Sequence, residues 1–336
     1  MKNLVDLRSD TVTSPSKEML ECVLEAKTGD DVYGEDPTVN QLESYVASLT
    51  KKEKALFVTS GTQGNLTAIL AHCQRGDEYI AGSEAHTYKY EAGGAAVLGS
   101  VQPQPIPFNS RGEIPLDLAE LALKPDNNHF ARTRLLCLEN TNVGKVLSLA
   151  YLSETKEFAF KNELKVHLDG ARAFNAAAKL DVPISEITKY ADTCSLCLSK
   201  GLGAPMGSVL VGDSETIGRA RRWRKMLGGG MRQAGLMAAA GMYALENNLD
   251  SLKQDQLNAA SFANGIRELQ RLGLEEEPQT NMVIIKIDDH KLVTLKEFLK
   301  KNNVLISSRR FVFHRDISTD SCTRLIDLMR VFDESY

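Results

Sequence analysis

Two charged residues, Asp169 and Lys200, stand at the ends of apolar segments and are the strongest candidates for chemistry. Asp169 follows the apolar run 165–168, and Lys200 follows the apolar run 193–198. In an open α/β sheet, ligands bind where the carboxyl ends of the strands meet. A buried lysine there tends to lose its proton and to act as a nucleophile or base. Taken singly, Asp169 is explained equally well as a helix cap or a partner of Arg172, and Lys200 as a surface lysine in a glycine-rich loop.

A third candidate is the turn that leaves the apolar run 55–58 and enters a helical pattern at Gly61. This geometry directs backbone N–H groups and the positive end of a helix dipole to one point, where an anion such as phosphate binds. Ser60 and Thr62 add hydroxyl groups, although a plain helix cap accounts for the same residues. The chain has neither a P-loop pattern nor G-x-G-x-x-G after a strand, which disfavours nucleotide and dinucleotide sites.

The order of these features points to one cofactor. A phosphate turn comes first, Asp169 second, and Lys200 follows 31 residues later. Pyridoxal phosphate requires a phosphate cradle, a Schiff-base lysine and an acid that keeps its ring nitrogen protonated. His86 lies between the turn and Asp169, where it either stacks on the ring and assists proton transfer or caps a helix. We therefore predict a pyridoxal-phosphate enzyme with Lys200, Asp169 and His86 as catalytic residues and no metal ion.

The elements that must position these residues alternate along the chain. Such alternation predicts an α/β fold with a mostly parallel sheet between helices. The expected strands are 55–58, 79–81, 134–138, 165–168, 193–198 and 208–211, and the helices between them include 63–73 and 152–163.

After residue 231 the pattern of expected helices and strands changes to that of a smaller α+β unit. We place its start near residue 249, which gives an N-terminal arm with a large cofactor-binding domain, 1–248, and a small C-terminal domain, 249–336. Its expected helices are 251–271, 293–300 and 318–332, after a helix at 233–248, and its expected strands are 282–287, 304–306 and 311–313.

Composition is that of an ordinary soluble globular protein, with 336 residues, 43% hydrophobic and 25% charged. A net charge of -4 gives no case for a nucleic-acid or anionic-membrane partner. The start, 1–6, does not resemble a signal peptide, and no apolar run approaches the ~20 residues that span a bilayer. The six cysteines, including the pair Cys194 and Cys197 in one expected strand, are expected to be free thiols. We therefore expect a cytoplasmic protein with a small-molecule substrate.

Seven short segments, taken in order, form a pattern that is far more specific than any one of them. Together they resemble the low-specificity threonine aldolases, a family of fold-type I pyridoxal-phosphate enzymes, and the match runs from Asp6 to the last helix. The segments are Leu7–Thr13, Gly29–Thr38, Ser60–Thr62, His86, His167–Arg172, Leu198–Gly203 and Trp223–Gln233.

The resemblance implies cleavage of L-threonine or L-allo-threonine to glycine and acetaldehyde, by a homotetramer with active sites shared at dimer interfaces. It also implies a role for each matching residue. Lys200 would hold the cofactor, Asp169 would pair with its ring nitrogen, and His86 would stack on the ring. The residues implied to complete the cofactor site are Ser60, Gly61, Thr62, Arg172 and, toward a neighbouring subunit, Arg232; those implied to contact the substrate are Ser9, Arg172, Tyr33 and Asn142.

Two departures from the family pattern fall at substrate positions. Asn142 stands after Glu-Asn-Thr, where relatives carry a histidine, and an amide is no useful base. The family also places a carboxylate-binding arginine in a C-terminal Val-Arg-Leu-Val-Thr-His run. Here the corresponding run looks shortened, with Phe313 near that position, and the possible substitutes are Arg309, Arg310 and Arg315.

Alternative functions remain open from the sequence. A β-eliminating lyase, an amino-acid racemase and an aminotransferase share the same cofactor logic. A non-catalytic binding protein is disfavoured because Lys200 and Asp169 are both present, and a nicotinamide dehydrogenase is disfavoured because the glycine fingerprint is absent.

Overall fold

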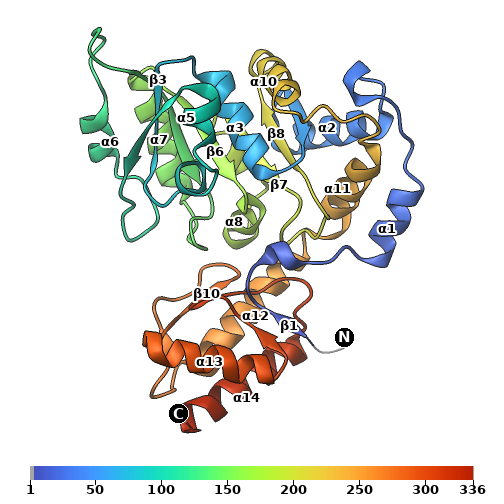
Figure 1. Cartoon of the computed structure of the whole chain (residues 1–336), viewed down its shortest axis with the longest axis vertical. Helices are drawn as coiled ribbons and strands as arrows, with labels where there is room; N and C mark the ends of the chain where they lie inside the picture. The colour runs from blue at the N-terminus through green and yellow to red at the C-terminus, as the bar shows by residue number, and fades with distance from the viewer. Residues whose placement is uncertain (1–3, 336) are drawn as a thin grey trace.

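A seven-stranded sheet forms the centre of the larger part of the molecule (Figure 1). This computed structural model describes residues 4–335. Six strands run parallel to one another, and only β8 runs antiparallel to its neighbours β2 and β7, so the predicted mostly parallel α/β sheet is confirmed. In spatial order the strands are β2 (Lys54–Val58), β8 (Ser208–Gly212), β7 (Thr193–Cys197), β6 (Lys165–Gly170), β5 (Arg132–Glu139), β3 (Asp77–Gly82) and β4 (Gln102–Ile106).

Helices cover both faces of this sheet, because the strands are apolar on both sides. Along β5, Leu136 and Leu138 join the larger apolar cluster, whereas Leu135 and Cys137 face the opposite cluster, as the twofold alternation of a strand requires. Helices α3 (Gly61–His72), α5 (Gly94–Gly99) and α10 (Ser214–Met226) pack on the second face. The first face is covered by α2 (Pro37–Thr50), α6 (Leu116–Ala122), α7 (Leu149–Lys161), α8 (Ala173–Leu180), α9 (Ser185–Thr188) and α11 (Gly235–Asn247).

Strand β4 was not expected from the sequence because it contains Pro103 and Pro105. A proline cannot donate to a strand ladder, so it is tolerated where one side of a strand is unpaired. β4 is such an edge strand, paired only with β3. The sequence analysis also missed α1 (Lys17–Leu24) and α2, whose first residue Pro37 follows the capping residue Asp36.

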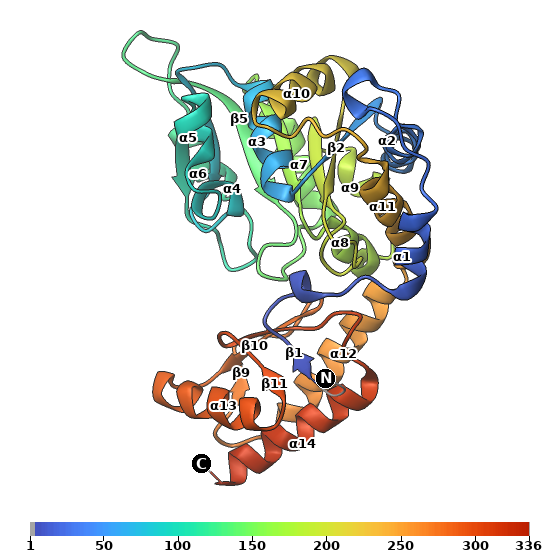
Figure 2. The ribbon, with the colours of Figure 1, turned by 45° about the vertical axis from the view of Figure 1, so that its right-hand side comes forward.

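The smaller part combines an antiparallel sheet with three helices, so its α+β character is confirmed (Figure 2). The N-terminal strand β1 (Val5–Asp6) pairs with β11 (Val304–Leu305), and Val5 and Leu7 are buried in the apolar core of this part. The N-terminal segment therefore runs from the small core to the large one, and the boundary at residue 248 stays a prediction. The other elements here are β9 (Gly273–Leu274), β10 (Met282–Lys286), β12 (Arg310–Val312), α12 (Ser251–Ile266), α13 (Asp289–Lys301) and α14 (Thr319–Ser335).

Within residues 4–335, no helix combines the length and the apolar character that crossing a membrane would require.

Candidate active site

The carboxyl ends of β5, β6 and β7 bring the central candidates together. Glu139 ends β5 and lies opposite Asp169 of β6, which in turn lies opposite Ser195 of β7. Lys200 follows three residues after β7. Asp169 and Lys200 therefore lie at the same edge of the sheet, and their predicted role in ligand binding stays a prediction.

Asp169 is 2% exposed and has only neutral hydrogen-bond donors around its carboxylate. The Asn65 side chain donates to Oδ2 at 2.8 Å, and the backbone N–H of Ala171 donates to Oδ1 at 3.0 Å. No lysine or arginine within residues 4–335 forms an ion pair with it. A buried carboxylate without a cation is costly, so this position suits a cationic group such as a protonated pyridine nitrogen.

Lys200 is held by its backbone while its amine is left without a carboxylate partner. Thr13 donates a hydrogen bond to the Lys200 carbonyl at 2.8 Å, and Asn248 donates to the carbonyl of Leu202 at 2.7 Å. The Nζ atom lies 3.5 Å from the Sγ atom of Cys197. The amine is thus positioned on a fixed turn and is free to react with a carbonyl group.

The turn that is predicted to bind phosphate lies at the start of α3, close to the end of β7. Ser60 caps the helix by accepting from the Gln63 N–H at 3.1 Å, and its neighbours Gly61 and Thr62 form the first turn. A Cβ atom on Gly61 would lie 2.8 Å from the Cys197 Sγ atom, so the turn approaches the Lys200 strand as closely as glycine allows. The N-terminus of α3 and the Lys200 amine therefore both lie close to Cys197. An anion site near a reactive lysine fits a phosphorylated cofactor.

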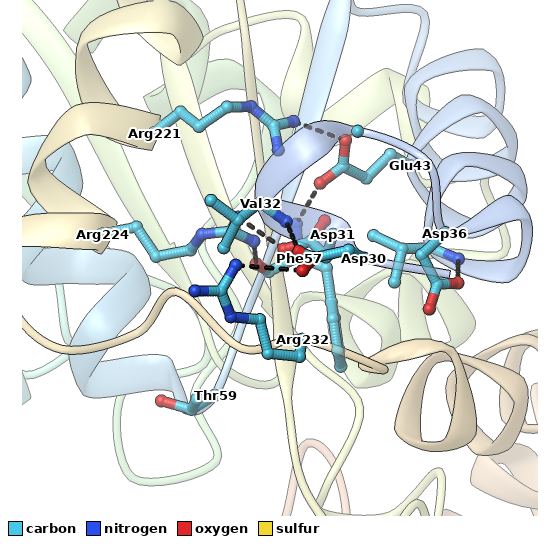
Figure 3. A network of polar contacts seen from close by, with 12 residues as sticks. Asp30, Asp31, Val32, Asp36, Glu43, Phe57, Thr59, Arg221, Arg224 and Arg232 are labelled. Carbon is cyan, nitrogen blue, oxygen red and sulfur yellow. Dashed lines mark hydrogen bonds and ion pairs between the residues drawn. The ribbon is translucent and has the colours of Figure 1, made fainter. Parts of the chain in front are cut away.

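Arg232 and Tyr33 lie elsewhere in the single chain. Arg232 pairs with Asp30 at 2.9 Å, in a network drawn in Figure 3, and its side chain is 56% exposed. Tyr33 is 74% exposed. Within the described residues, neither forms a hydrogen bond or an ion pair with Ser60, Gly61 or Thr62, and their predicted roles across a subunit interface stay predictions.

His86 is oriented by two carboxylates that the sequence analysis did not single out. Its Nδ1 atom lies 2.8 Å from Glu91 Oε1, and its backbone N–H donates to Glu139 at 2.7 Å. The hydrogen bond to Glu91 raises the pKa of His86 against the opposing effect of burial. One ligand atom each from His86, Glu91 and Asp169 lies within 4.8 Å of the others. With Nδ1 engaged, Nε2 is the ring atom left to exchange a proton.

Glu139 is a further ionisable group at this edge. Burial, together with the neighbouring charge of Asp169, raises the pKa of Glu139 to about 7. Its other oxygen accepts from the Asn142 side chain at 3.1 Å. Glu139 ends an apolar strand, just as Asp169 does, so the strand-end argument applied to β5 would have found it. A pKa near neutrality is what a proton donor or acceptor in a reaction requires.

Arg172 forms a buried pair with Asp10, which ties the N-terminal segment to the site. Its Nε and Nη2 atoms donate to the two carboxylate oxygens at 2.7 and 2.6 Å. Burial alone would raise the pKa of Asp10, but the Arg172 charge and hydrogen bonds lower it to about 2. Ser9 caps the short helix that Asp10 begins, by accepting from the Thr11 N–H, and so stands beside this pair.

Of the three C-terminal arginines, Arg310 is the one that combines an unpartnered Nε atom with an electrostatic interaction with Arg172. Burial and then the charge of Arg172 lower the pKa of Arg310, and its buried Nε atom has no hydrogen-bond partner within the described chain. Arg309 is engaged away from the site, with the Ile287 carbonyl and with Asp289. Phe313, which the sequence analysis placed near the carboxylate position, is fully buried in the small core.

Arg315 packs against the turn that carries the lysine. A Cβ atom on Gly203 would lie 2.8 Å from Arg315 Nη1. Among the described residues this nitrogen has no hydrogen-bond partner, and it is buried. Arg315 therefore supports the turn from the side of the small part.

Comparisons with known proteins identify the family. The family described as Beta-eliminating lyase matches residues 6–290. The low specificity L-threonine aldolase of Escherichia coli K12 is 51% identical over 98% of this chain and 99% of its own. Low-specificity L-threonine aldolase 1 of Arabidopsis thaliana is 42% identical over 94% and 92% of the two chains. In structure, the Leishmania major threonine aldolase superposes with a TM-score of 0.84 at 19% identity, covering 98% of this chain and 99% of its own. The chain therefore belongs to the beta-eliminating lyase family and, within it, to the low-specificity L-threonine aldolases, with the fold of the fold-type I pyridoxal-phosphate enzymes.

Proposed function

We propose that the protein is a pyridoxal-phosphate-dependent aldehyde-lyase that cleaves L-threonine, L-allo-threonine and related β-hydroxy-α-amino acids to glycine and an aldehyde. The observation that carries this proposal is Asp169, a buried carboxylate without a cation, at the same edge of the sheet as Lys200, whose amine has no carboxylate partner within residues 4–335. Membership of the threonine aldolase family supports the enzyme class, the cofactor and an amino-acid substrate.

Five residues would hold the cofactor. Lys200 would bind it covalently, Asp169 would hold its ring nitrogen, and the capped N-terminus of α3 at Ser60, Gly61 and Thr62 would hold its phosphate. When bound, the cofactor withdraws the electron pair of a bond that breaks at the substrate Cα atom. Asp169 favours that withdrawal because its ionised carboxylate stabilises positive charge on the nitrogen.

The substrate carboxylate would bind between two guanidinium groups. Arg172 spends two nitrogens on Asp10 and keeps Nη1 without a partner in the described chain. Arg310, on β12, would be the second group, since its Nε atom has no partner among the described residues and it interacts electrostatically with Arg172. Two cations share one aspartate here, so one positive charge is left over for an anionic ligand. Ser9 lies alongside as a further contact.

The proton of the β-hydroxyl group would pass to His86. Its Nδ1 atom is bound to Glu91, which leaves Nε2 as the acceptor. Glu139, with its pKa of about 7, contacts both the His86 backbone and Asn142, and so lies where a second proton can be exchanged. Loss of the hydroxyl proton is what allows the Cα–Cβ bond to break with release of an aldehyde.

β-Elimination is the second candidate, since the matching family is named for it. The two reactions differ in products: threonine yields glycine and acetaldehyde by aldol cleavage, and ammonia and a 2-oxo acid by elimination. We expect the first pair when purified protein with pyridoxal phosphate is given threonine or allo-threonine, and glycine with formaldehyde when it is given serine. Racemisation would be recognised in the same assay by D-amino acid, and transamination by a new amino acid once a 2-oxo acid is added as the amino-group acceptor.

A matched lysine pair tests the site within this assay. Lys200→Ala should lose the visible absorbance of the bound cofactor and all measurable turnover. Lys52→Ala should keep both, because the half-buried Lys52 amine donates only to the Ala191 carbonyl among the described residues. Retention of a reducible Schiff base in Lys200→Ala would place the anchor on another lysine.

We also propose a cytoplasmic homotetramer with active sites at dimer interfaces. Exposed apolar side chains near the N-terminal segment support an interface there, together with the exposed Tyr33 and Arg232. All six cysteines are free, which suits a reducing compartment. Light scattering coupled to gel filtration should give four times the chain mass of 37.0 kDa. A monomer would contradict the proposed roles of Tyr33 and Arg232.

A further inference from the structure

Behind Asp169, the side chain of Asn65 bridges two carboxylates that face the candidate site. Asn65 lies in α3 and is 1% exposed. Its Nδ2 atom lies 2.8 Å from Asp169 Oδ2 and 2.8 Å from Glu91 Oε1, although these residues are 104 and 26 positions away in sequence. Because two carboxylates are acceptors in this arrangement, the amide nitrogen must face them, and each of its hydrogens serves one of them. The Oδ1 atom must therefore face away from the site.

On its other side, Asn65 is oriented by His167. The His167 Nε2 atom lies 3.0 Å from Asn65 Oδ1, which can only accept, so Nε2 must carry the hydrogen. Nδ1 then accepts from the Thr193 hydroxyl at 2.9 Å. That hydroxyl has no second hydrogen, so His72 Nε2, also 2.9 Å away, must donate to it. The hydrogen-bonded row therefore runs His72, Thr193, His167, Asn65 and Asp169, and the direction of every hydrogen bond in it is fixed.

Burial keeps both rings of the row neutral. It lowers the pKa of His167 to about 3 and that of His72 to about 4. Neither ring therefore gains a proton in the range where the site works, and neither N–H position changes. A row with fixed donors acts as a fixed dipole that points its positive end toward Asp169.

The fold builds this row from regular spacing. His167 and Asp169 are two residues apart on β6 and so share one face of the sheet. Thr193 lies opposite His167 in the register of β7. Helix α3 covers that face and contributes Asn65 and His72, which are two helical turns apart on one side of the helix.

The row is not a proton path, because a side-chain amide does not pass protons on. We propose instead that Asn65, oriented by His167, is a positioning residue that fixes the Asp169 carboxylate in place for the cofactor nitrogen and, through Glu91, fixes the Nδ1–H form of His86. This inference rests on the proposed function, since it assigns Asp169 to the cofactor nitrogen and His86 Nε2 to the substrate proton. The Asn65 amide would then position both Asp169, the partner of the cofactor nitrogen, and His86, the acceptor of the substrate proton.

Repulsion between the two carboxylates explains why such a bridge is needed. Burial, and the charge of Asp169, raise the pKa of Glu91, while the hydrogen bonds from His86 and Asn65 lower it. Without the amide hydrogens, the pKa of Glu91 would rise further and the two carboxylates would move apart. Asp169 would then no longer be held in position for a positive ring nitrogen.

The first test measures cofactor affinity rather than turnover. Apo protein is titrated with pyridoxal phosphate, and binding is followed by visible absorbance and fluorescence. We expect Asn65→Leu to weaken binding about ten-fold or more, from the loss of charge-assisted hydrogen bonds. The matched control is Asn258→Leu, a buried asparagine that donates to the Ile317 carbonyl in the small part. It should change stability without changing affinity by more than about two-fold. Equal affinity in wild type and a folded Asn65→Leu would overturn the proposal.

The isosteric variant Asn65→Asp keeps the test decisive if the leucine variant does not fold. A protonated aspartic acid can still donate one hydrogen bond, whereas its ionised form adds a third negative charge. The ratio of variant to wild-type dissociation constants should therefore be near one at about pH 6 and rise about ten-fold by pH 8.5. A ratio that does not change with pH would contradict the role given to the amide hydrogens.

Variants of His167 examine the orientation of the amide. His167→Gln can still donate to Asn65 Oδ1 and should keep affinity near that of wild type, whereas His167→Leu cannot and should resemble Asn65→Leu. Equal effects of the two substitutions would contradict an orienting role. These titrations use no amino-acid substrate, so a failure of the proposed aldol cleavage in the product assay is separable from a failure of this inference.

Discussion

Two buried arginine–aspartate pairs tie the N-terminal segment to the large sheet, and they differ in how accessible the remaining N–H groups of each arginine are. Asp10 begins one short helix and pairs with Arg172, while Asp31 begins another and pairs with Arg224. The shortest N–O distance is 2.6 Å in both pairs. We call them the site pair and the edge pair, because the first lies beside Lys200 and the second beside the edge strand β2.

The edge pair is enclosed. Arg224 gives one nitrogen to Asp31 and another to the Phe57 carbonyl at 2.7 Å (Figure 3), and its Nε atom is buried without a hydrogen-bond partner among the described residues. Both charged side chains are almost fully buried. The site pair is more open, because the Arg172 side chain is 14% exposed and its Nη1 atom has no partner in the described chain, while Nε and Nη2 bind Asp10. Each arginine thus has an unused N–H group, and access to that group separates the two pairs: we expect the site pair to bind a ligand and the edge pair to support structure only.

Breaking the edge pair should have the largest effect, and it should appear in stability. Arg224→Leu leaves the buried Asp31 charge without a partner, which typically costs about 3–5 kcal/mol of unfolding free energy. Urea unfolding of wild type and variant measures this loss. The double variant with Asp31→Leu should recover most of it, because an apolar pair often replaces a buried ion pair at little cost. A loss below about 1 kcal/mol would mean that the edge pair is not structural.

The site pair should respond in catalysis instead. Arg172→Lys keeps a charge near Asp10 but lacks the planar fork, so it cannot hold Asp10 and a substrate carboxylate together. We expect kcat/KM to fall about 100-fold, equivalent to ~2.7 kcal/mol, with little change in cofactor affinity. The control Arg309→Lys alters an exposed pair with Asp289 and should leave kcat/KM unchanged. If Arg172→Lys lost stability rather than turnover, the contrast between the two pairs would disappear.

The residues that the sequence identified are those whose position along the chain determines their place in space. Asp169 and Lys200 end strands, and parallel strands end at one edge, so their proximity follows from pattern alone. Ser60 and Gly61 follow by the same logic from a strand-to-helix turn.

What the sequence did not predict depends on contacts across the fold. In the sequence, Asn65 is an ordinary helical residue, and its contact with Asp169 arises only because α3 packs on β6. Glu91 became a candidate only when the structure placed it against the His86 ring. The three C-terminal arginines could not be ranked from the sequence, because their partners are set by the pairing of β12 with β10 and by the packing around Arg309 and Arg315. Such assignments depend on tertiary packing, which local spacing does not encode.

The pH dependence of stability sharpens the comparison further. Arg172 lowers the pKa of Asp10 from 3.8 to about 2, so the site pair contributes stability that is complete above about pH 4 and is lost as pH falls through about 2. The shift corresponds to about 2 kcal/mol. Asp10→Asn should lack this contribution, and the stability difference between wild type and variant should therefore shrink on acidification from pH 5. Urea unfolding at several pH values measures it, and a difference independent of pH would contradict the assignment.

The smallest effect is expected at Asn142, which we propose as a contact of the substrate rather than of the cofactor. Asn142 is 6% exposed and donates to Glu139 at 3.1 Å, and it stands where the family resemblance led us to expect a histidine. A histidine here would exchange an amide for a titratable ring beside a carboxyl group whose pKa is about 7. Threonine and allo-threonine differ only at the β-hydroxyl group, so a change in one hydrogen bond to that oxygen alters their ratio. We expect Asn142→His to change the ratio of kcat/KM for the two substrates about ten-fold, or ~1.4 kcal/mol. Asn142→Ala separates the loss of the amide from the gain of the ring. Cofactor titration should give the same affinity in all three proteins, because Lys200, Asp169 and Ser60 are untouched. An unchanged ratio with weakened cofactor binding would move Asn142 from the substrate to the cofactor side of the site.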